Sequence, residues 1–170
     1  MTTVTVRAMT PVEFDEWQTA IAEEYARDQI AAGRWSADGA VERARDENTA
    51  RLPQGLDTPR MLLLRGVDAD GTPIGRAWVG LDHPRGAPDL AFLYDIEVLP
   101  SRRGSGLGRA LLAAVEQATA DAGAGALELN VFGTNAAGIG LYESAGYEVS
   151  TQQMRKTLAG GSPRAETTEE

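Results

Sequence analysis

Hydrophobic side chains recur along the chain at two distinct spacings, and the longer spacing predicts helices. Near the N-terminus the residues three or four positions apart are Phe14, Trp17, Ile21 and Tyr25. This spacing places them on one face of a helix. Thr10 followed by Pro11 is a typical helix start, because a hydroxyl caps the free N–H groups and proline fits the first turn. We expect this helix to run to Ala32 and to end at Gly33.

Three further segments have helical signatures. Residues 40–52 form a second helix that Pro53 stops. A third, strongly amphipathic helix begins near residue 107 and stops near Gly123; its apolar positions are Leu107, Leu111, Leu112, Val115 and Ala118. Residues 135–144 form a short fourth helix that Gly146 closes.

The shorter spacing and continuous apolar runs predict strands at residues 4–9, 61–67, 74–81, 90–99 and 126–132. Asp68–Gly71 is a turn signal that joins two of them into a hairpin. Residues 147–158 are expected to form a final hairpin-like pair. The order of elements predicts an α/β (α+β) fold, with a mixed, mostly antiparallel central sheet of six to seven strands and about four flanking helices.

Length and composition indicate one domain without a nucleic-acid or membrane partner. The chain has 170 residues, of which 42% are hydrophobic, enough for one core. We expect a single domain over residues 1–158 and a disordered acidic tail over 159–170, which has no large apolar side chain. A net charge of -9 disfavours phosphate backbones and anionic membranes. Without a signal-like or membrane-spanning stretch, we expect a cytoplasmic protein.

The chain has no cysteine and a single histidine, His83. These counts exclude a thiol nucleophile, a disulfide framework and a cysteine-containing metal site. We expect no metal, and therefore an organic cofactor if there is one.

A basic, glycine-rich segment lies between the strand that ends at Pro100 and the long helix. Its sequence is Val98-Leu99-Pro100-Ser101-Arg102-Arg103-Gly104-Ser105-Gly106-Leu107-Gly108-Arg109. Glycines let backbone N–H groups approach an anion, and the helix that follows points its positive end at the same place. Taken alone, the segment is either a phosphate-binding turn or a tight turn without a ligand. It matches neither a P-loop nor a dinucleotide fingerprint.

Two signatures together resemble the GNAT superfamily of acetyltransferases. Arg103-Gly104-Ser105-Gly106-Leu107-Gly108 is similar to its pyrophosphate-binding pattern, Arg/Gln-x-x-Gly-x-Gly/Ala. Residues 129–147 resemble its second pattern, Asn-x-x-Ala/Gly followed by Leu-Tyr-x-x-x-Gly-Phe/Tyr, with Asn135 and Tyr142 at matching positions. The resemblance extends over most of residues 1–158 and implies the GNAT fold, in which two central strands splay apart.

The resemblance implies acetyl-CoA as cosubstrate. Backbone N–H groups of residues 103–108 would hold its pyrophosphate, with charge from Arg103 or Arg109. The pantetheine arm would lie along the backbone of the preceding strand and contact Asn135. The expected cofactor-binding residues are Ile96, Val98, Arg103, Gly104, Ser105, Gly106, Leu107, Gly108, Arg109, Asn135 and Tyr142.

The resemblance also implies direct transfer, in which a neutral amine attacks the thioester and CoA leaves. Tyr142 matches the usual general acid. Asp95 and Glu97 are candidate bases, because both alternate with apolar residues and so share one face of a strand. Similarity to a bacterial subgroup of undefined substrate, carried by Leu52–Pro59 and the pair Tyr94-Asp95, favours Asp95. Proton loss to solvent is the alternative.

The acceptor is expected to be a primary amine of a small molecule or peptide. The expected substrate-binding residues are Tyr25, Trp35, Tyr94 and Asn130. Asn130 stands where some relatives that acetylate protein N-termini carry a glutamate base, and an amide cannot take that proton. Dimerisation is common in the superfamily, so a homodimer is compatible with the resemblance. The alternative function is an acyl-CoA-binding sensor without turnover.

Overall fold

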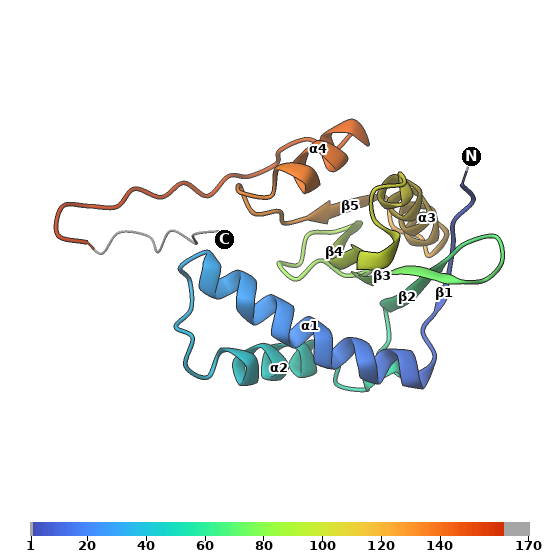
Figure 1. The fold of residues 1–170 in the computed structure, drawn as a ribbon, viewed down its shortest axis with the longest axis horizontal. Helices are drawn as coiled ribbons and strands as arrows, with labels where there is room; N and C mark the ends of the chain where they lie inside the picture. Colours follow the sequence, from blue (N-terminus) through green and yellow to red (C-terminus); the bar gives the residue numbers. More distant parts are fainter. Residues whose placement is uncertain (1, 162–170) are drawn as a thin grey trace.

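A twisted sheet forms the middle layer of the protein, with helices on both faces (Figure 1). The computed structural model describes residues 2–161. In chain order its strands and α-helices are β1 (Thr5–Ala8), α1 (Pro11–Ala31), α2 (Ala40–Arg51), β2 (Met61–Val67), β3 (Pro73–Gly80), β4 (Leu90–Val98), α3 (Leu107–Asp121), β5 (Ala126–Leu129) and α4 (Ala136–Ser144). Short 3₁₀ helices cover Gly55–Asp57 and Pro100–Arg102.

The sheet is mixed, with strand order β1-β2-β3-β4-β5. Its first four strands are antiparallel neighbours, whereas β5 runs parallel to β4 after the crossover through α3. The expected mixed, mostly antiparallel sheet with four helices is confirmed.

The expected count of six to seven strands is not confirmed, because the described residues form five. Residues 147–158, expected to be a hairpin-like pair, enter no ladder of this sheet. A strand pattern supplies suitable side chains, but a ladder also needs a second backbone alongside. Most of the expected acidic tail, from residue 162 on, lies outside the described residues.

The start of α1 is fixed by a capping box. The Thr10 side chain accepts from the Glu13 N–H, and the Thr10 N–H donates to Glu13 Oε2 at 2.9 Å. Arg7 adds two bonds to the same carboxylate, at 2.8 and 2.9 Å. The helix ends close to the expected position, where Gly33 adopts the left-handed φ of 66°.

Alternating side chains of the sheet build two separate cores. Leu63 and Trp78, which are register partners, face α1 and pack with Trp17. Leu64 and its partner Ala77 face the opposite side, where α3 packs on the sheet. Because both faces of β2 and β3 are covered, these strands are near-continuous apolar runs in the sequence.

Two glycines let α3 lie close to the sheet. A Cβ at Gly66 would lie 2.6 Å from Leu111 Cδ1, and a Cβ at Gly75 would lie 2.5 Å from the carbonyl oxygen of Glu97. Both distances are shorter than real Cβ contacts, so neither position has room for a side chain. The backbone of β3 is therefore held tightly against the end of β4.

We expect Gly75→Ala to lower the free energy of unfolding by about 1–3 kcal/mol, because the new methyl group overpacks the contact between β3 and β4. Gly133→Ala is the control: its Cβ would meet nothing within 4 Å and its φ is not positive. Urea titration measures both. Equal midpoints for Gly75→Ala and the unsubstituted protein would show that the contact is not tight.

We expect Glu13→Gln to destabilise the protein by on the order of 1 kcal/mol at pH 7. Hydrogen bonds from Arg7 lower the pKa of Glu13 to about 2, against an ordinary value of 4.5. A carboxyl with a lowered pKa contributes stability above its unfolded-state pKa and loses it as the pH falls through its folded-state pKa. The deficit of the variant should therefore shrink between pH 4.5 and about 2.

Glu16→Gln, at an exposed position of the same helix, is the matched loss of charge. Denaturation at several pH values gives the loss in free energy of unfolding for each of the two variants. The loss for Glu13→Gln in excess of that for Glu16→Gln is the quantity to compare across pH. An excess that did not change with pH would contradict the ion pair with Arg7.

Candidate active site

The ladder between β4 and β5 ends halfway along β4. The two strands pair from Leu90 and Ala126 to Leu93 and Leu129, but β4 continues to Val98. On its other side β4 stays paired with β3 to its end. Within residues 2–161, the segment 94–98 therefore has one edge without a strand partner. This is the splayed pair of central strands that the resemblance implied.

A β-bulge lies where the strands part. In the register with β3, Val79 faces Leu93 and Trp78 faces Asp95, so Tyr94 is the extra residue. A bulge bends its strand and increases the local twist. It accounts physically for β4 turning away from β5 at this point.

The glycine-rich turn adjoins the unpaired end of β4. Gly104 and Gly106 have φ values of 83° and 75°, the left-handed region that favours glycine. Gly106 is also the N-cap of α3, so the N–H groups of the first helical turn face the same place. A Cβ at either glycine would meet no described atom within 4 Å, and the space over the turn is open. The turn thus has the geometry of an anion site.

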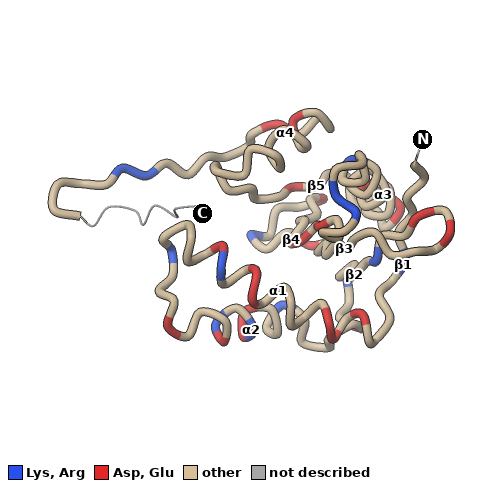
Figure 2. Tube along the Cα trace, viewed as in Figure 1, with Lys and Arg blue, Asp and Glu red and all other residues tan. Residues whose placement is uncertain are grey.

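The arginines around the turn have different partners. Arg102 binds Asp68 of the β2–β3 turn at 3.0 Å, and Arg109 donates to the carbonyl of Ser144 at the end of α4. Arg103 donates to the carbonyl of Val98 at 3.2 Å and pairs with Glu97. Figure 2 shows arginine at this turn in a chain with many acidic side chains. Arg103 joins the turn directly to β4.

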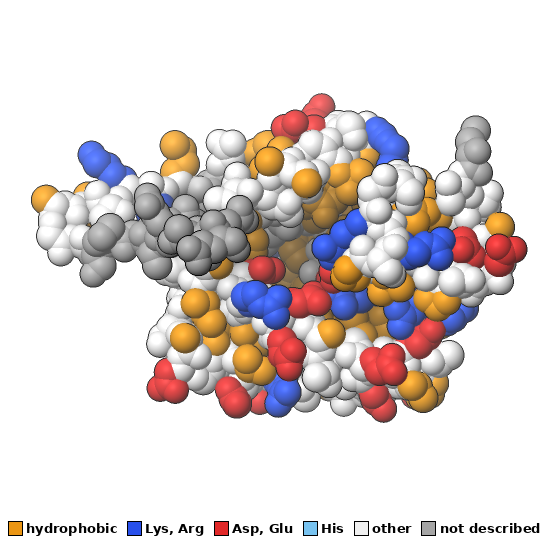
Figure 3. Space-filling model, in the orientation of Figure 1, with side chains coloured by type: hydrophobic (Ala, Val, Ile, Leu, Met, Phe, Trp, Pro, Cys, Tyr) orange, Lys and Arg blue, Asp and Glu red, His pale blue; other side chains and the backbone are white. Residues whose placement is uncertain are grey.

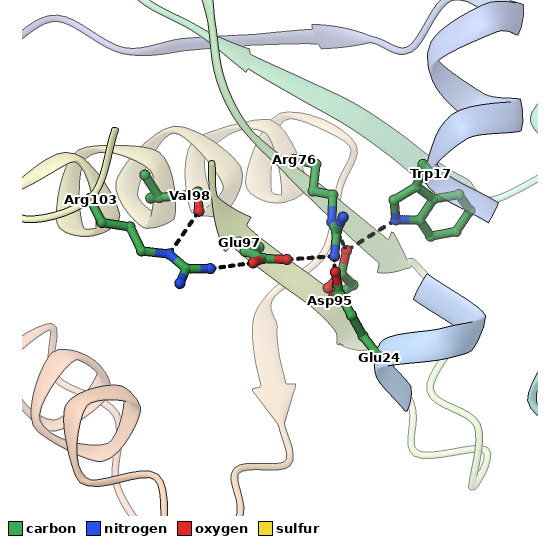
Figure 4. Close-up of polar contacts among 7 residues, drawn as sticks. All are labelled: Trp17, Glu24, Arg76, Asp95, Glu97, Val98 and Arg103. Carbon is green, nitrogen blue, oxygen red and sulfur yellow. Dashed lines mark hydrogen bonds and ion pairs between the residues drawn. The ribbon is translucent and has the colours of Figure 1, made fainter. Parts of the chain in front are cut away.

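Arg76 of β3 holds three carboxylates beside the unpaired edge of β4 (Figure 4). Its Nε donates to Asp95 Oδ2 at 3.0 Å, and its Nη2 donates to Glu97 Oε2 at 2.6 Å. The same Nη2 donates to Glu24 Oε2 of α1 at 2.5 Å. Trp17 Nε1 adds a bond to Asp95 Oδ2 at 3.1 Å. The network therefore ties α1 to both β3 and β4.

Burial sets the electrostatics of this network. Burial is the largest cause that raises the pKa of Asp95, and Arg76 opposes it. Burial likewise raises the pKa of Glu24, and neighbouring Glu97 adds to that rise. The side chain of Asp95 is 14% exposed, against 25% for Glu97. Asp95 and Glu97 lie on one face of β4, as the sequence predicted, and Arg76 of β3 binds both of them there.

Helix α4 carries Tyr142, and Asn135 caps the start of this helix. The Asn135 Oδ1 accepts from the Gly138 N–H at 2.9 Å. Half-buried Tyr142 packs edge-on against Tyr147, with 5.7 Å between ring centroids, and burial raises its pKa. A Cβ at Gly108 would lie 3.7 Å from Leu141 Cδ2 and 4.0 Å from a methyl of Val98, so α4, the turn and β4 converge.

Three of the four expected acceptor residues lie in one region. Tyr25 packs edge-on against Trp35 at 5.3 Å, and its hydroxyl donates to Glu47 at 3.5 Å. Arg51 bonds the carbonyl of Glu47 and lies over the ring of Tyr94. Exposed Asn130 is elsewhere, in a groove along β5.

Figure 3 shows a hollow in the face of the molecule that is turned toward the viewer, with hydrophobic side chains inside it and charges of both signs around it.

Across residues 2–161, His, Cys, Asp and Glu side chains make no group of three suited to a metal ion. No helix in the described chain combines the length and apolar character needed to cross a bilayer.

Sequence reasoning missed Trp17, Glu24 and Arg76. Trp17 lies on the apolar helix face that the spacing predicted and is buried in the core, but its indole N–H also donates to Asp95. Arg76 was the available signal, because it is the one charged residue in the otherwise apolar segment Ile74–Gly80. A buried arginine in a strand requires carboxylate partners, which would have led to Glu24.

The chain is similar to known acetyltransferases in sequence and in fold. The profile of the Acetyltransferase (GNAT) family matches residues 19–147. The uncharacterized N-acetyltransferase YycN of Bacillus subtilis is 30% identical over 156 residues, covering 92% of this chain and 99% of YycN. The crystal structure of YycN superposes with a TM-score of 0.85 over the same shares of the two chains.

One further relative and one structural neighbour have a named substrate or ligand. An aminoglycoside N(6′)-acetyltransferase type 1 of Stenotrophomonas maltophilia is 33% identical over 124 residues, covering 70% of this chain and 69% of that protein. The PaiA N-acetyltransferase of Thermoplasma acidophilum, solved with coenzyme A, shares the fold at a TM-score of 0.62 and 18% identity, covering 89% of this chain and 93% of that one. The splayed strands, the glycine turn and the matching family profile together show that the chain belongs to the GNAT family and is an N-acetyltransferase.

Proposed function

We propose that the enzyme transfers the acetyl group of acetyl-CoA directly to a neutral primary amine of a small molecule or peptide. The observation that carries this proposal is the unpaired edge of β4 beside the left-handed glycine turn. The turn suits a pyrophosphate, and the edge of β4 at Ile96 and Val98, which has no strand partner, suits the amide groups of a pantetheine arm. We assign the enzyme activity to a single domain over residues 1–158. We also assign the protein to the cytoplasm, where acetyl-CoA is available as the cosubstrate.

Acetyl-CoA supplies an activated thioester, and the protein supplies binding, orientation and proton transfer. The N–H groups of residues 103–108 bind the pyrophosphate, which the N-terminus of α3 stabilises. Arg103 is placed to add charge. Arg109 acts indirectly, by holding the end of α4 through the carbonyl of Ser144.

Tyr142 is the proposed proton donor to the departing thiolate. Its pKa is raised by burial, so its hydroxyl keeps its proton at neutral pH and can give it up as the sulfur gains charge. Asn135 orients the helix that carries it, through the cap at the start of α4.

Glu97 is the proposed proton acceptor for the attacking amine, directly or through water. Both carboxylates accept from Arg76, and Glu97 also pairs with Arg103, whereas Asp95 is also held by Trp17 in the core. The side chain of Glu97 is the more exposed of the two and therefore the more accessible to an amine or a water. We assign Asp95 a positioning role, in which it fixes Arg76. Three carboxylates, those of Glu24, Asp95 and Glu97, lie together here, and their negative charge favours an acceptor that carries positive charge. The named aminoglycoside acetyltransferase among the relatives supports the same class.

The proposed function is tested by thiol release from acetyl-CoA with aminoglycosides, polyamines, lysine and short peptides as acceptors. Release that depends on one class of amine supports transfer. Binding of acetyl-CoA without release to any amine would favour an acyl-CoA sensor. Failure to bind CoA would overturn both functions.

We expect Tyr142→Phe to lower kcat by about 10²–10⁴-fold, the usual contribution of a general acid, and to change the KM for acetyl-CoA little. The urea midpoint of the variant should stay close to that of the parent, because the aromatic ring is retained. Steady-state kinetics on the active amine checks the expectation. An unchanged kcat would remove Tyr142 from the mechanism.

Glu97→Gln and Asp95→Asn distinguish the two carboxylates. We expect Glu97→Gln to lower kcat, since the amide of glutamine cannot accept the proton of the attacking amine. Asp95→Asn should mainly lower stability, because it weakens a buried contact of Arg76. Kinetics over a pH series and urea titration of both variants measure the two effects. The reverse pattern would make Asp95 the base.

A further inference from the structure

Arg103 connects the glycine-rich turn to the edge of β4 beyond its ladder with β5. Its Nε donates to the carbonyl of Val98 at 3.2 Å, and its Nη2 donates to Glu97 Oε1 (Figure 4). The N–H of Leu99 donates to the carbonyl of Ile74 in β3 at 2.9 Å. Because the C=O and N–H of one trans peptide group point in opposite directions, the carbonyl of Val98 points away from β3. Arg103 therefore binds a backbone acceptor on the edge that the proposed function assigns to the pantetheine arm.

Glu97 is bound by a guanidinium at each of its two oxygens. Oε1 accepts from Arg103, and Oε2 accepts from Arg76 at 2.6 Å. A general base must lie within hydrogen-bond reach of the proton that it takes. An amine or a water that gives its proton to Glu97 must therefore compete with one of two cations. The proposed base becomes accessible when one of these cations turns away.

Arg103 is the cation that can turn away with little loss of stability. The side chain of Arg76 is 11% exposed and also holds Asp95 and Glu24, so its release would break the network that ties α1 to the sheet. The side chain of Arg103 is 57% exposed, and exposed ion pairs contribute little to stability. Its contact with Glu97 is therefore the exchangeable one.

The turn offers Arg103 a stronger partner than a carboxylate. Arg103 directly precedes Gly104, whose φ of 83° belongs to the proposed pyrophosphate-binding turn. A pyrophosphate carries more negative charge than a carboxylate, and its oxygens match the paired N–H donors of a guanidinium. Glu97 and a pyrophosphate would thus compete for one exposed cation.

We propose that Arg103 is a positioning residue that links the pyrophosphate of acetyl-CoA to the acid–base step. When its guanidinium turns from β4 to the pyrophosphate, Oε1 of Glu97 becomes free to accept the proton that the attacking amine loses. The carbonyl of Val98 becomes free to accept from an amide N–H of the pantetheine arm. Arg103 thus selects against thioesters that lack a pyrophosphate. This inference rests on the proposed function, in which Glu97 is the proton acceptor and the turn binds the pyrophosphate.

Calorimetric binding of CoA tests the competition without turnover. The four proteins to compare are the parent, Arg103→Ala, Glu97→Gln and the double variant. Glutamine has nearly the size of glutamate but holds a guanidinium less tightly. We therefore expect Glu97→Gln to bind CoA more tightly than the parent by at least about twofold, the low end of couplings between contacting residues. This gain should vanish in the Arg103→Ala background.

Asp68→Asn is the matched control for the loss of charge, because Asp68 binds Arg102 of the same turn at 3.0 Å. Its effect on CoA affinity should be the same with and without Arg103. An equal gain from Glu97→Gln in both backgrounds would reflect only the removal of one negative charge near the turn. That result, or no gain in the presence of Arg103, would overturn the proposal.

S-Acetylpantetheine, a donor without pyrophosphate, provides the kinetic test. With an amine that the parent acetylates from acetyl-CoA, we expect the parent to use this donor slowly and to be accelerated by added ADP, which supplies a separate pyrophosphate group. Arg103→Ala should use the same donor at least about twofold faster than the parent, because the contacts with Glu97 and Val98 are gone. Added ADP should not accelerate this variant. An Arg103 that only supports the turn predicts instead a variant that is slower with either donor.

The two donors also separate this inference from the proposed function. Turnover of acetyl-CoA by the parent, together with an Arg103→Ala variant that uses S-acetylpantetheine no faster than the parent, would overturn this inference alone. No turnover of acetyl-CoA with any amine would overturn the proposed function and this inference with it.

Discussion

The site depends on the parting of β4 from β5 after Leu93 and Leu129. Up to that point the two strands are ordinary parallel neighbours, and beyond it the backbone from Tyr94 to Val98 keeps only its partner β3. The bulge at Tyr94 bends the strand, and the close approach at Gly75 holds its end against β3. An unpaired stretch of backbone inside a sheet is costly unless something bonds it. A ligand with amide groups along its length meets that need.

One buried guanidinium, that of Arg76, binds three carboxylates around this opening. Arg76 holds Asp95, Glu97 and Glu24, and through Glu24 it sets the position of α1 over the sheet. Breaking a buried ion-pair network is strongly destabilising, because the charges left behind have no water to solvate them. The same residues that hold the helix on the sheet therefore also place carboxylates beside the proposed reaction centre.

The sequence predicted the parts of the fold that local chemistry decides. The cap at Thr10, the end of α1 near Gly33 and the glycine turn before α3 follow from short-range bonds and backbone conformation, so their residues are visible as motifs. The Arg76 network joins residues more than 50 positions apart, as in the contact of Arg76 with Glu24, and no spacing rule finds such a pair. The C-terminal strand pattern misled the strand count for a related reason, because pairing depends on a second backbone and not on side-chain alternation alone.

Amide hydrogen exchange with and without CoA tests the central claim most directly. If the opening of β4 and the glycine turn form the cofactor site, CoA should slow exchange in the segment 94–98 and in residues 103–108, while β1 and α2 stay unchanged. Protection confined to other segments, or none at saturating CoA, would contradict the assignment of the site to the parted strands.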